Sequence, residues 1–371
     1  MLHTITGLDV YSVSTPIPSP VSDANFTIFS AGMIVVRVTT SEGFSGYGTT
    51  FSVSVPTSVP EFILKTLKPV VLGKDCMAYE EIWNAMYGAV RQVGRKGFSY
   101  LGLSAIDIAI WDLRGKILGM PIFRMLGGTN RLIPTYASGG WLSWSLDKTI
   151  DIVKTWVEQG YFIIKIKVGI EGGRNLIGDA KRVESIRKAI GDDVGLILDA
   201  NGVWTSPDAI RFAHMVRDCN ILVYEEPCCA DDIPGLRRVR EMTGLAVGTG
   251  ENEYTKYGIR DLVLGEAVDV VQMDIGRTGG FTEMLKVAAI TEAWNLKLAP
   301  HAWEAISAHL LSAVSNGLFL EKLDSTQELI FKKAVENFPI PQNGLYEIPD
   351  LPGLGLNFDQ EFLEGNNLVN N

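Results

Sequence analysis

From residue 130 onward, the sequence alternates between short apolar runs and segments with the spacing of amphipathic helices. Ser206-Pro207-Asp208, for example, supplies a cap and a first-turn proline for one such helix. The runs are continuously apolar, which is typical of parallel strands covered on both faces. Eight strand–helix repeats predict a TIM-type barrel, and a doubly wound open sheet fits the same pattern. We expect the strands at residues 134–138, 161–168, 194–199, 221–225, 246–251, 268–274, 296–301 and 318–321.

The first 130 residues have a different pattern, in which strand-like segments precede helical ones. The last helical segment has the clearest apolar face, and we take Ser104 as its cap. The expected strands are residues 4–13, 33–40 and 44–49, and the expected helices are residues 58–71, 79–92 and 103–118. This order predicts an α+β module.

These patterns divide the chain into three parts. Residues 1–130 form the α+β module, and residues 131–325 form the barrel. Residues 326–371 form a C-terminal segment, which we expect to pack back on the first module.

The composition excludes several classes of protein. A net charge of −10 and a pI near 5.0 argue against nucleic-acid and anionic-membrane partners, which need clustered Lys and Arg. No apolar run approaches the roughly 18 residues of a membrane helix, and the N-terminus lacks the order of a signal peptide. The four cysteines are irregularly spaced, which predicts reduced thiols rather than a disulfide framework. We therefore expect a cytoplasmic protein.

Charged or titratable side chains end seven of the eight predicted strands. In a βα barrel the active site lies at these C-terminal ends. Lys165 and Lys167 end the second strand and point to the same face, because side chains alternate along a strand. The six strands that follow end in Asp199, Glu225, Glu251, Asp274, His301 and Glu321.

Three of these residues are carboxylates at equal spacing. Asp199, Glu225 and Glu251 follow one another at intervals of 26 residues, so successive strands bring them side by side. Three clustered anions are costly to bury without a cation, and oxygen ligands favour Mg²⁺ over Zn²⁺. In addition, Asp274 beside His301 can fix the imidazole tautomer and raise its basicity.

The ordered set of strand-end residues resembles the mandelate racemase subgroup of the enolase superfamily. Two further segments, residues 103–112 and 301–310, are also similar to that family. The resemblance covers nearly the whole chain. It implies an α/β fold with a modified TIM barrel, (β/α)7β, and an N-terminal α+β capping domain.

The resemblance also implies roles for the strand-end residues. Asp199, Glu225 and Glu251 would hold Mg²⁺, which would bind the carboxylate of a small-molecule substrate. Lys167 would be the base on one face of the substrate, and the nearby Lys165 would lower its pKa and help bind the carboxylate.

The remaining strand-end residues would act from the other side of the substrate. His301, oriented by Asp274, would be the acid–base group on the opposite face, and Glu321 would hydrogen-bond the substrate carboxylate. Family members that are cycloisomerases or dipeptide epimerases place a second lysine on the sixth strand, where this chain has Asp274.

A lysine and a histidine on opposite faces support two reactions after removal of the α-proton. A dehydratase expels a β-hydroxyl and forms a 2-keto-3-deoxy acid, whereas a racemase or epimerase returns the proton to the other face. Dehydration of sugar acids is the commoner activity in the subgroup, and we favour it. A non-catalytic metal-binding barrel is the least favoured alternative.

The N-terminal region bears on the substrate. Residues 16–24 and 138–142, together with Gly94-Arg95, are similar to dehydratases acting on galactarate and talarate. Residues 25–32 contain no Lys or Arg, however, which favours a monocarboxylic sugar acid or a less polar substrate. Arg95 and Lys96 are candidates for a distal positive charge. The family is commonly oligomeric, so we also expect a homo-oligomer.

Overall fold

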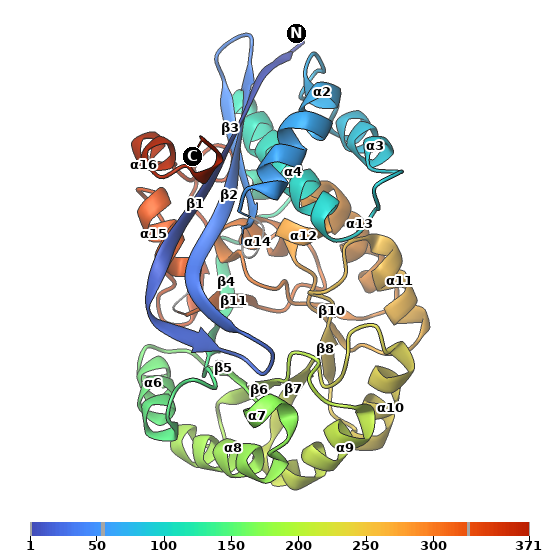
Figure 1. The fold of residues 1–371 in the computed structure, drawn as a ribbon, viewed down its shortest axis with the longest axis vertical. Coiled ribbons are helices and arrows are strands. Elements are labelled where there is room, and N and C mark those ends of the chain that lie inside the picture. Colours follow the sequence, from blue (N-terminus) through green and yellow to red (C-terminus); the bar gives the residue numbers. More distant parts are fainter. Residues whose placement is uncertain (1, 53–55, 325–326, 371) are drawn as a thin grey trace.

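The structure is a computed structural model that describes residues 2–52, 56–324 and 327–370. An antiparallel sheet in the order β1-β2-β3 lies beside a curled parallel sheet surrounded by helices (Figure 1). The antiparallel strands are β1 (Ile5–Ser22), β2 (Thr27–Thr40) and β3 (Ser45–Phe51). The helices that follow them are α1 (Ser58–Phe62), the π-helix η1 (Ile63–Leu67), α2 (Lys68–Val71), α3 (Tyr79–Ala89), α4 (Phe98–Leu118) and α5 (Ile122–Met125).

The β1–β2 hairpin is longer than the sequence indicates. β1 continues past Pro16 to Ser22, and its register with β2 shifts between Pro16 and Val21. Prolines are tolerated because β1 is an edge strand, in which one row of N–H groups has no partner strand. The extra length carries the hairpin across the end of the barrel (Figure 1).

Helix α4 lies between the antiparallel sheet and the barrel. It begins at Phe98, so the prediction that Ser104 caps it is wrong. Ser104 lies inside the helix, where its hydroxyl donates to the carbonyl of Tyr100 (2.7 Å). A Cβ at Gly48 of β3 would lie 2.1 Å from the carbonyl oxygen of Ala105, so a glycine is needed for this close approach.

All eight strands predicted after residue 130 are present. Neighbouring strands are parallel and follow the order β10-β9-β8-β7-β6-β5-β4-β11, and a bridge from Leu298 to Gly317 joins the two ends. This consecutive order confirms the modified barrel and excludes the doubly wound sheet, whose strand order reverses. The strands are β4 (Leu132–Gly139), β5 (Ile163–Lys167), β6 (Gly195–Asp199), β7 (Ile221–Glu225), β8 (Val247–Thr249), β9 (Val270–Val271), β10 (Lys297–Leu298) and β11 (Leu320–Leu323).

Helices cover the outside of this sheet (Figure 1). The helix predicted near Ser206-Pro207-Asp208 is present, although its cap is Thr205. The helices are α6 (Leu146–Glu158), α7 (Ile170–Gly173), α8 (Leu176–Ile190), α9 (Ser206–Met215), the 3₁₀ helix η2 (Arg217–Cys219), α10 (Ile233–Thr243), α11 (Lys256–Leu264), α12 (Ile275–Thr278), α13 (Gly280–Ala293) and α14 (Glu304–Leu311).

The C-terminal segment contacts the first strand of the chain. Asn367 accepts a hydrogen bond from the backbone of Ser12 (2.9 Å), and Lys333 donates to Thr15 (2.6 Å). The segment also adds β12 antiparallel to β4. Its elements are α15 (Gln327–Ala334), β12 (Leu345–Glu347), α16 (Gln360–Gly365) and the 3₁₀ helix η3 (Leu368–Asn370).

Two expectations from composition concern the state of the cysteines and the presence of membrane-spanning helices. All four cysteines are free thiols, as predicted, and three of them are buried: Cys76, Cys219 and Cys228. Across residues 2–52, 56–324 and 327–370, no helix has the length and apolar character needed to cross a bilayer.

His309 is a buried histidine that joins three parts of the fold. Its Nδ1 accepts from the backbone N–H of Phe123 (3.2 Å), and its Nε2 donates to the carbonyl of Leu354 (3.2 Å). Burial lowers the pKa of His309 to about 4. The imidazole is therefore neutral in the folded protein at neutral pH.

This buried histidine predicts acid sensitivity. As the pH falls below about 6.5, His309 takes up a proton in the unfolded chain but not in the folded protein. The free energy of unfolding therefore decreases until the pH reaches the folded pKa of about 4. Between about pH 7 and pH 5, the wild type should lose about 2 kcal/mol more unfolding free energy than His309→Gln. Denaturant titrations of both proteins measure this difference. Equal losses would contradict the assignment.

Candidate active site

The predicted strand-end residues gather at one end of the barrel. In the strand ladders, Lys167 pairs with Asp199, and Asp199 pairs with Glu225, so the ends of β5, β6 and β7 lie side by side. Glu251 and His301 follow β8 and β10 in the loops at the same end.

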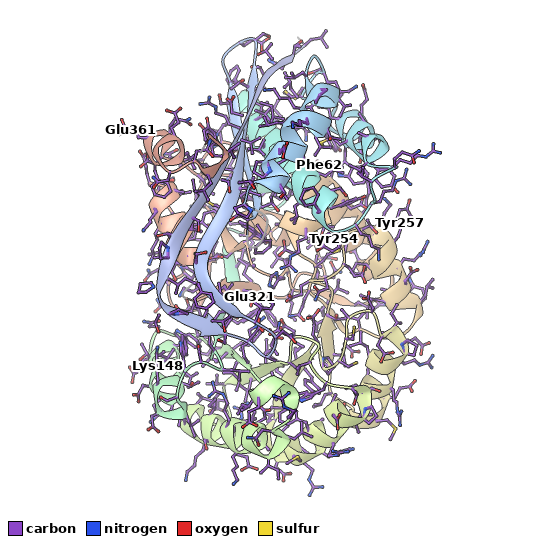
Figure 2. All side chains as sticks on the ribbon, in the orientation of Figure 1. Phe62, Lys148, Tyr254, Tyr257, Glu321 and Glu361 are labelled. Atoms are coloured by element: carbon purple, nitrogen blue, oxygen red, sulfur yellow. The ribbon has the colours of Figure 1, made fainter. Side chains whose placement is uncertain are left out.

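One group of contacts centres on the two lysines. Lys165 Nζ lies 2.6 Å from Glu225 Oε1, 2.6 Å from Glu321 Oε1 and 3.5 Å from Asp199 Oδ2. Lys167 Nζ is paired with the same Asp199 oxygen. Lys165 is only 1% exposed, and Glu321, which is labelled in Figure 2, is also buried. The buried ammonium groups are therefore neutralised by carboxylates from three other strands.

A second group centres on His301. Its Nδ1 lies 2.6 Å from Asp274 Oδ2, while Nε2 faces Glu251 Oε2 at 3.4 Å and Glu321 Oε2 at 3.9 Å. Burial alone would lower the pKa of His301, but the charge of Glu251 and the hydrogen bond to Asp274 outweigh it and raise the pKa to about 9. Glu321 belongs to both groups and joins them.

Carboxyl groups outnumber cationic groups at this end of the barrel. Burial and the charge of Asp199 raise the pKa of Glu225 to about 8, and burial together with Glu251 raises that of Glu226 well above its usual range. The carboxyl groups are Asp199, Glu225, Glu226, Glu251, Asp274 and Glu321, and the cationic or titratable bases are Lys165, Lys167, Arg277 and His301.

This donor set fits a divalent cation by charge and by chemistry. The excess carboxylates supply hard oxygen ligands of the kind Mg²⁺ prefers. In the described part of the chain, no three acidic, histidine or cysteine side chains already converge on one point as a metal site. Asp199 and Glu225 instead bind the two lysine ammonium groups.

The pKa expected for Lys167 is wrong for this arrangement. Burial and the charge of Lys165 lower the pKa of Lys167, but the charges of Asp199, Glu251 and Glu225 together outweigh them, and the pKa is raised. Sequence spacing placed the two lysines together correctly. The spacing did not show that the carboxylate of Asp199 would pair directly with the ammonium group of Lys167.

Glu321 lies between the cationic groups of Lys165 and His301. Burial favours its neutral form, but Lys165 and His301 hold its pKa well below the usual range. The ionised carboxylate accepts a hydrogen bond from the backbone N–H of Ala302 (2.9 Å). Donation to a substrate carboxylate would require Glu321 to take up a proton first.

Several polar residues of the site were missed from the sequence. Gln272 Nε2 donates to Glu225 Oε2 (2.5 Å), and Asn252 donates to Glu226 (2.7 Å). Gln272 lies two residues before Asp274, so strand alternation could have placed it on the same face. No comparable spacing signal identifies Asn252.

The tip of the β1–β2 hairpin is attached to the loops at the barrel end. Asn25 Nδ2 donates to the carbonyl of Asn201 (2.7 Å), and the N–H of Leu142 donates to the carbonyl of Ser22 (2.8 Å). Farther along, Phe51 of β3 stacks on the His301 ring with centroids 6.2 Å apart. The antiparallel sheet thus covers this end of the barrel with apolar and uncharged groups.

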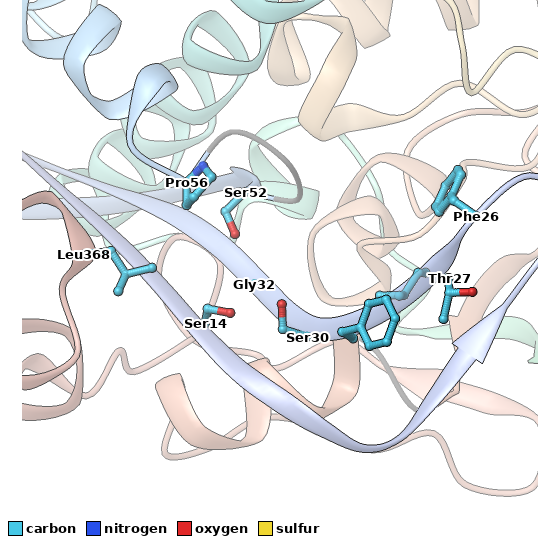
Figure 3. A pocket seen from close by; sticks show the side chains of 10 residues that line it. Ser14, Phe26, Thr27, Ser30, Gly32, Ser52, Pro56 and Leu368 are labelled. Carbon is cyan, nitrogen blue, oxygen red and sulfur yellow. The ribbon is translucent and has the colours of Figure 1, made fainter.

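The hairpin itself forms a groove of 480 Å³ (Figure 3). Phe26 and Phe29 line it and are 58% and 67% exposed. The candidate distal cations have partners elsewhere. Arg95 lies over the Tyr87 ring, 4.0 Å from its centroid, and Lys96 pairs with Glu253 (3.4 Å).

Comparisons with known proteins agree with this architecture. Residues 5–127 match the mandelate racemase / muconate lactonizing enzyme N-terminal domain, and residues 148–362 match the enolase C-terminal domain-like family. An arabinonate dehydratase of Saccharolobus solfataricus is 31% identical over 87% of each chain. A 3,6-anhydro-alpha-L-galactonate cycloisomerase of Streptomyces coelicolor is 30% identical over 96% of each chain.

A solved structure extends the agreement to three dimensions. A racemase from Streptomyces coelicolor A3(2) with bound magnesium superposes with a TM-score of 0.92 at 29% identity, covering 98% of this chain and 100% of that one. The chain therefore belongs to the mandelate racemase/muconate lactonizing enzyme family of the enolase superfamily, as its strand-end residues predict.

Proposed function

We propose that the protein is a Mg²⁺-dependent acid-sugar dehydratase. It removes the proton α to a carboxylate and then eliminates a β-hydroxyl as water, giving a 2-keto-3-deoxy acid. The observation that carries this proposal is the placement of two bases. Lys167 on β5 and His301 after β10 are separated around the barrel by the strands that carry Asp199, Glu225 and Glu251.

Asp199, Glu225 and Glu251 would hold the metal ion. A Mg²⁺ ion there would supply positive charge to offset the negative charge that develops on the substrate when the α-proton leaves. The carboxylate excess described above supports this assignment, and the racemase of similar structure contains magnesium. Lys165, buried beside the same carboxylates, is placed to attract the substrate carboxylate.

Lys167 and His301 divide the proton transfers. One of them, in its unprotonated form, takes the α-proton, and the C–H electron pair then forms the enediolate. As the enediolate returns its electrons, the bond to the β-hydroxyl breaks, and the leaving oxygen takes a proton from His301 or Lys167 acting as general acid. Asp274, 2.6 Å from His301 Nδ1, holds that imidazole with Nε2 facing the carboxylates.

The same two bases would also serve a racemase or epimerase of a 2-hydroxy acid. The difference lies in the substrate, since elimination needs a hydroxyl on the β-carbon. We favour a monocarboxylic sugar acid, because the hairpin tip that approaches the site carries Phe26 and Phe29 and no Lys or Arg. The small-molecule carboxylate is the proposed partner, within a homo-oligomer in the cytoplasm.

A substrate screen tests the reaction. Incubation with Mg²⁺ and a library of mono- and dicarboxylic sugar acids should yield 2-keto-3-deoxy acids, detected as α-keto acids, from a monocarboxylic member. Inverted configuration with α-deuterium uptake in heavy water and no keto product would indicate a racemase. Isomerised lactones or anhydro acids would indicate a cycloisomerase. No reaction across the library would contradict the substrate class.

Replacing His301 tests which of the two bases removes the α-proton and which acts as the general acid. His301→Asn should lower dehydration by about 10²- to 10⁴-fold, the usual contribution of a general acid or base. Exchange of the α-proton with heavy water should survive if Lys167 is the abstracting base, and should be lost in Lys167→Ala. His214→Asn is the control, because His214 is exposed on α9. Full turnover by His301→Asn would contradict the proposed role.

A carboxylate exchange tests the metal assignment. Glu251→Gln should weaken Mg²⁺ binding by about 10-fold or more, because a charged ligand is lost. Isothermal titration calorimetry measures the affinity without turnover. Glu253→Gln is the matched control, since Glu253 lies two residues away and pairs with Lys96. Equal affinities of the two variants would remove Glu251 from the metal site.

A further inference from the structure

The segment that follows β9 is attached to the antiparallel sheet and its helices at several points. We call residues 274–282, which include α12 and the start of α13, the β9 turn. Thr50 donates to the carbonyl of Gly276 (2.6 Å), and Trp83 Nε1 donates to the carbonyl of Gly279 (2.9 Å). The turn is thus held by hydrogen bonds from β3 and α3.

Helix α4 adds three more hydrogen bonds to this turn. Ser104 Oγ accepts from the N–H of Gly279 (2.8 Å). Asp107 accepts from the N–H of Thr282 (3.0 Å) and from its hydroxyl (2.5 Å). A Cβ at Gly280 would lie 2.3 Å from Asp107 Oδ2, so the helix and the turn are in close contact. Ser104 and Asp107 are 0% and 1% exposed, and losing such buried bonds is costly.

The β9 turn also orients the carboxylate that holds His301. Asp274 Oδ1 accepts from the N–H of Gly276 (2.7 Å), and Asp274 Oδ2 lies 2.6 Å from His301 Nδ1. The position of Gly276 therefore sets the rotation of the Asp274 carboxyl group. Because hydrogen bonds weaken steeply with distance and angle, a small shift of the turn alters the contact with His301.

We propose that Ser104 and Asp107 of helix α4 are positioning residues for the His301–Asp274 pair, acting through the β9 turn. The kinetic part of this inference rests on the proposed function of His301. It gives the capping region a second role beside covering the site. It also accounts for two of the buried polar side chains of α4, including the serine that the sequence indicated as a cap.

Helix α4 contains its own control. Asp112 is as buried as Asp107 and accepts from the N–H groups of Tyr47 (2.8 Å) and Leu354 (2.7 Å), which belong to β3 and the C-terminal segment. A purely structural role predicts similar effects of Asp107→Ala and Asp112→Ala. A positioning role predicts that only Asp107→Ala lowers kcat, by about 10- to 100-fold with KM little changed. Asp107→Asn, which keeps one acceptor, should restore part of the loss.

A milder pair of variants guards against misfolding. Thr49 and Thr50 are adjacent on β3 and both fully buried, but only Thr50 donates to the β9 turn. Thr50→Val and Thr49→Val each remove one hydroxyl at nearly constant volume. Thr50→Val should lower kcat, and Thr49→Val should leave it unchanged.

A spectroscopic readout separates this inference from the proposed reaction. The chain has four histidines, so isotopically labelled histidine gives few imidazole signals, and His301→Asn identifies that of His301. The downfield Nδ1 proton expected from the short bond to Asp274 should shift or weaken in Asp107→Ala and Thr50→Val. It should be unchanged in Asp112→Ala and Thr49→Val.

The outcomes can be told apart. An unchanged His301 signal in Asp107→Ala and Thr50→Val, or an equal change in the two controls, would overturn the inference. A selective change of that signal in a protein that turns over no acid sugar would support the positioning role and refute the proposed reaction.

Discussion

Lys165 is 1% exposed and lies between carboxylates contributed by three different strands. An ammonium group in that position is stable only while all of its partners are in place, because a buried charge without a counter-charge costs several kcal/mol. The partners come from β6, β7 and β11, on both sides of β5. The charge of Lys165 is therefore neutralised only when the barrel closes and brings these strands together.

The antiparallel sheet and α4 complete that end of the barrel. Phe51 stacks on His301. The guanidinium carbon of Arg277 lies over the Phe51 ring, 4.7 Å from the ring centroid. Arg277 in turn donates to the carbonyl of Glu251 (2.9 Å). Removing water from charged groups strengthens their interactions, so the cover affects the chemistry as well as access. Both modules of the chain thus contribute to the same electrostatic environment.

The barrel and its strand-end residues could be predicted because they depend on local pattern. Continuous apolar runs mark buried parallel strands, and a charged residue at the end of each run is visible in one dimension. The pKa of Lys167 could not be predicted in this way, because it depends on burial and on how many carboxylates surround the ammonium group in space. Gln272 was missed although its spacing from Asp274 was available.

Two errors in the N-terminal region have tertiary causes. Pro16 and its neighbouring prolines suggest the end of a strand, but an edge strand has no need of their missing N–H groups. Ser104 suggests a cap, but its hydroxyl is used by a turn 175 residues later in the chain. In both cases the local preference of a residue is outweighed by a contact that the sequence does not display.

The attachment of the β1–β2 hairpin has a consequence for how specificity can evolve. The tip is fastened by Asn25 to a carbonyl group, and by a bond between the backbones of Ser22 and Leu142. These fastenings do not depend on the side chains of Phe26 and Phe29. Substitutions at those two positions can therefore change what the tip presents to a ligand while its anchorage, and the acid–base groups below, stay constant. The attachment of the hairpin is thus independent of the two phenylalanine side chains at its tip.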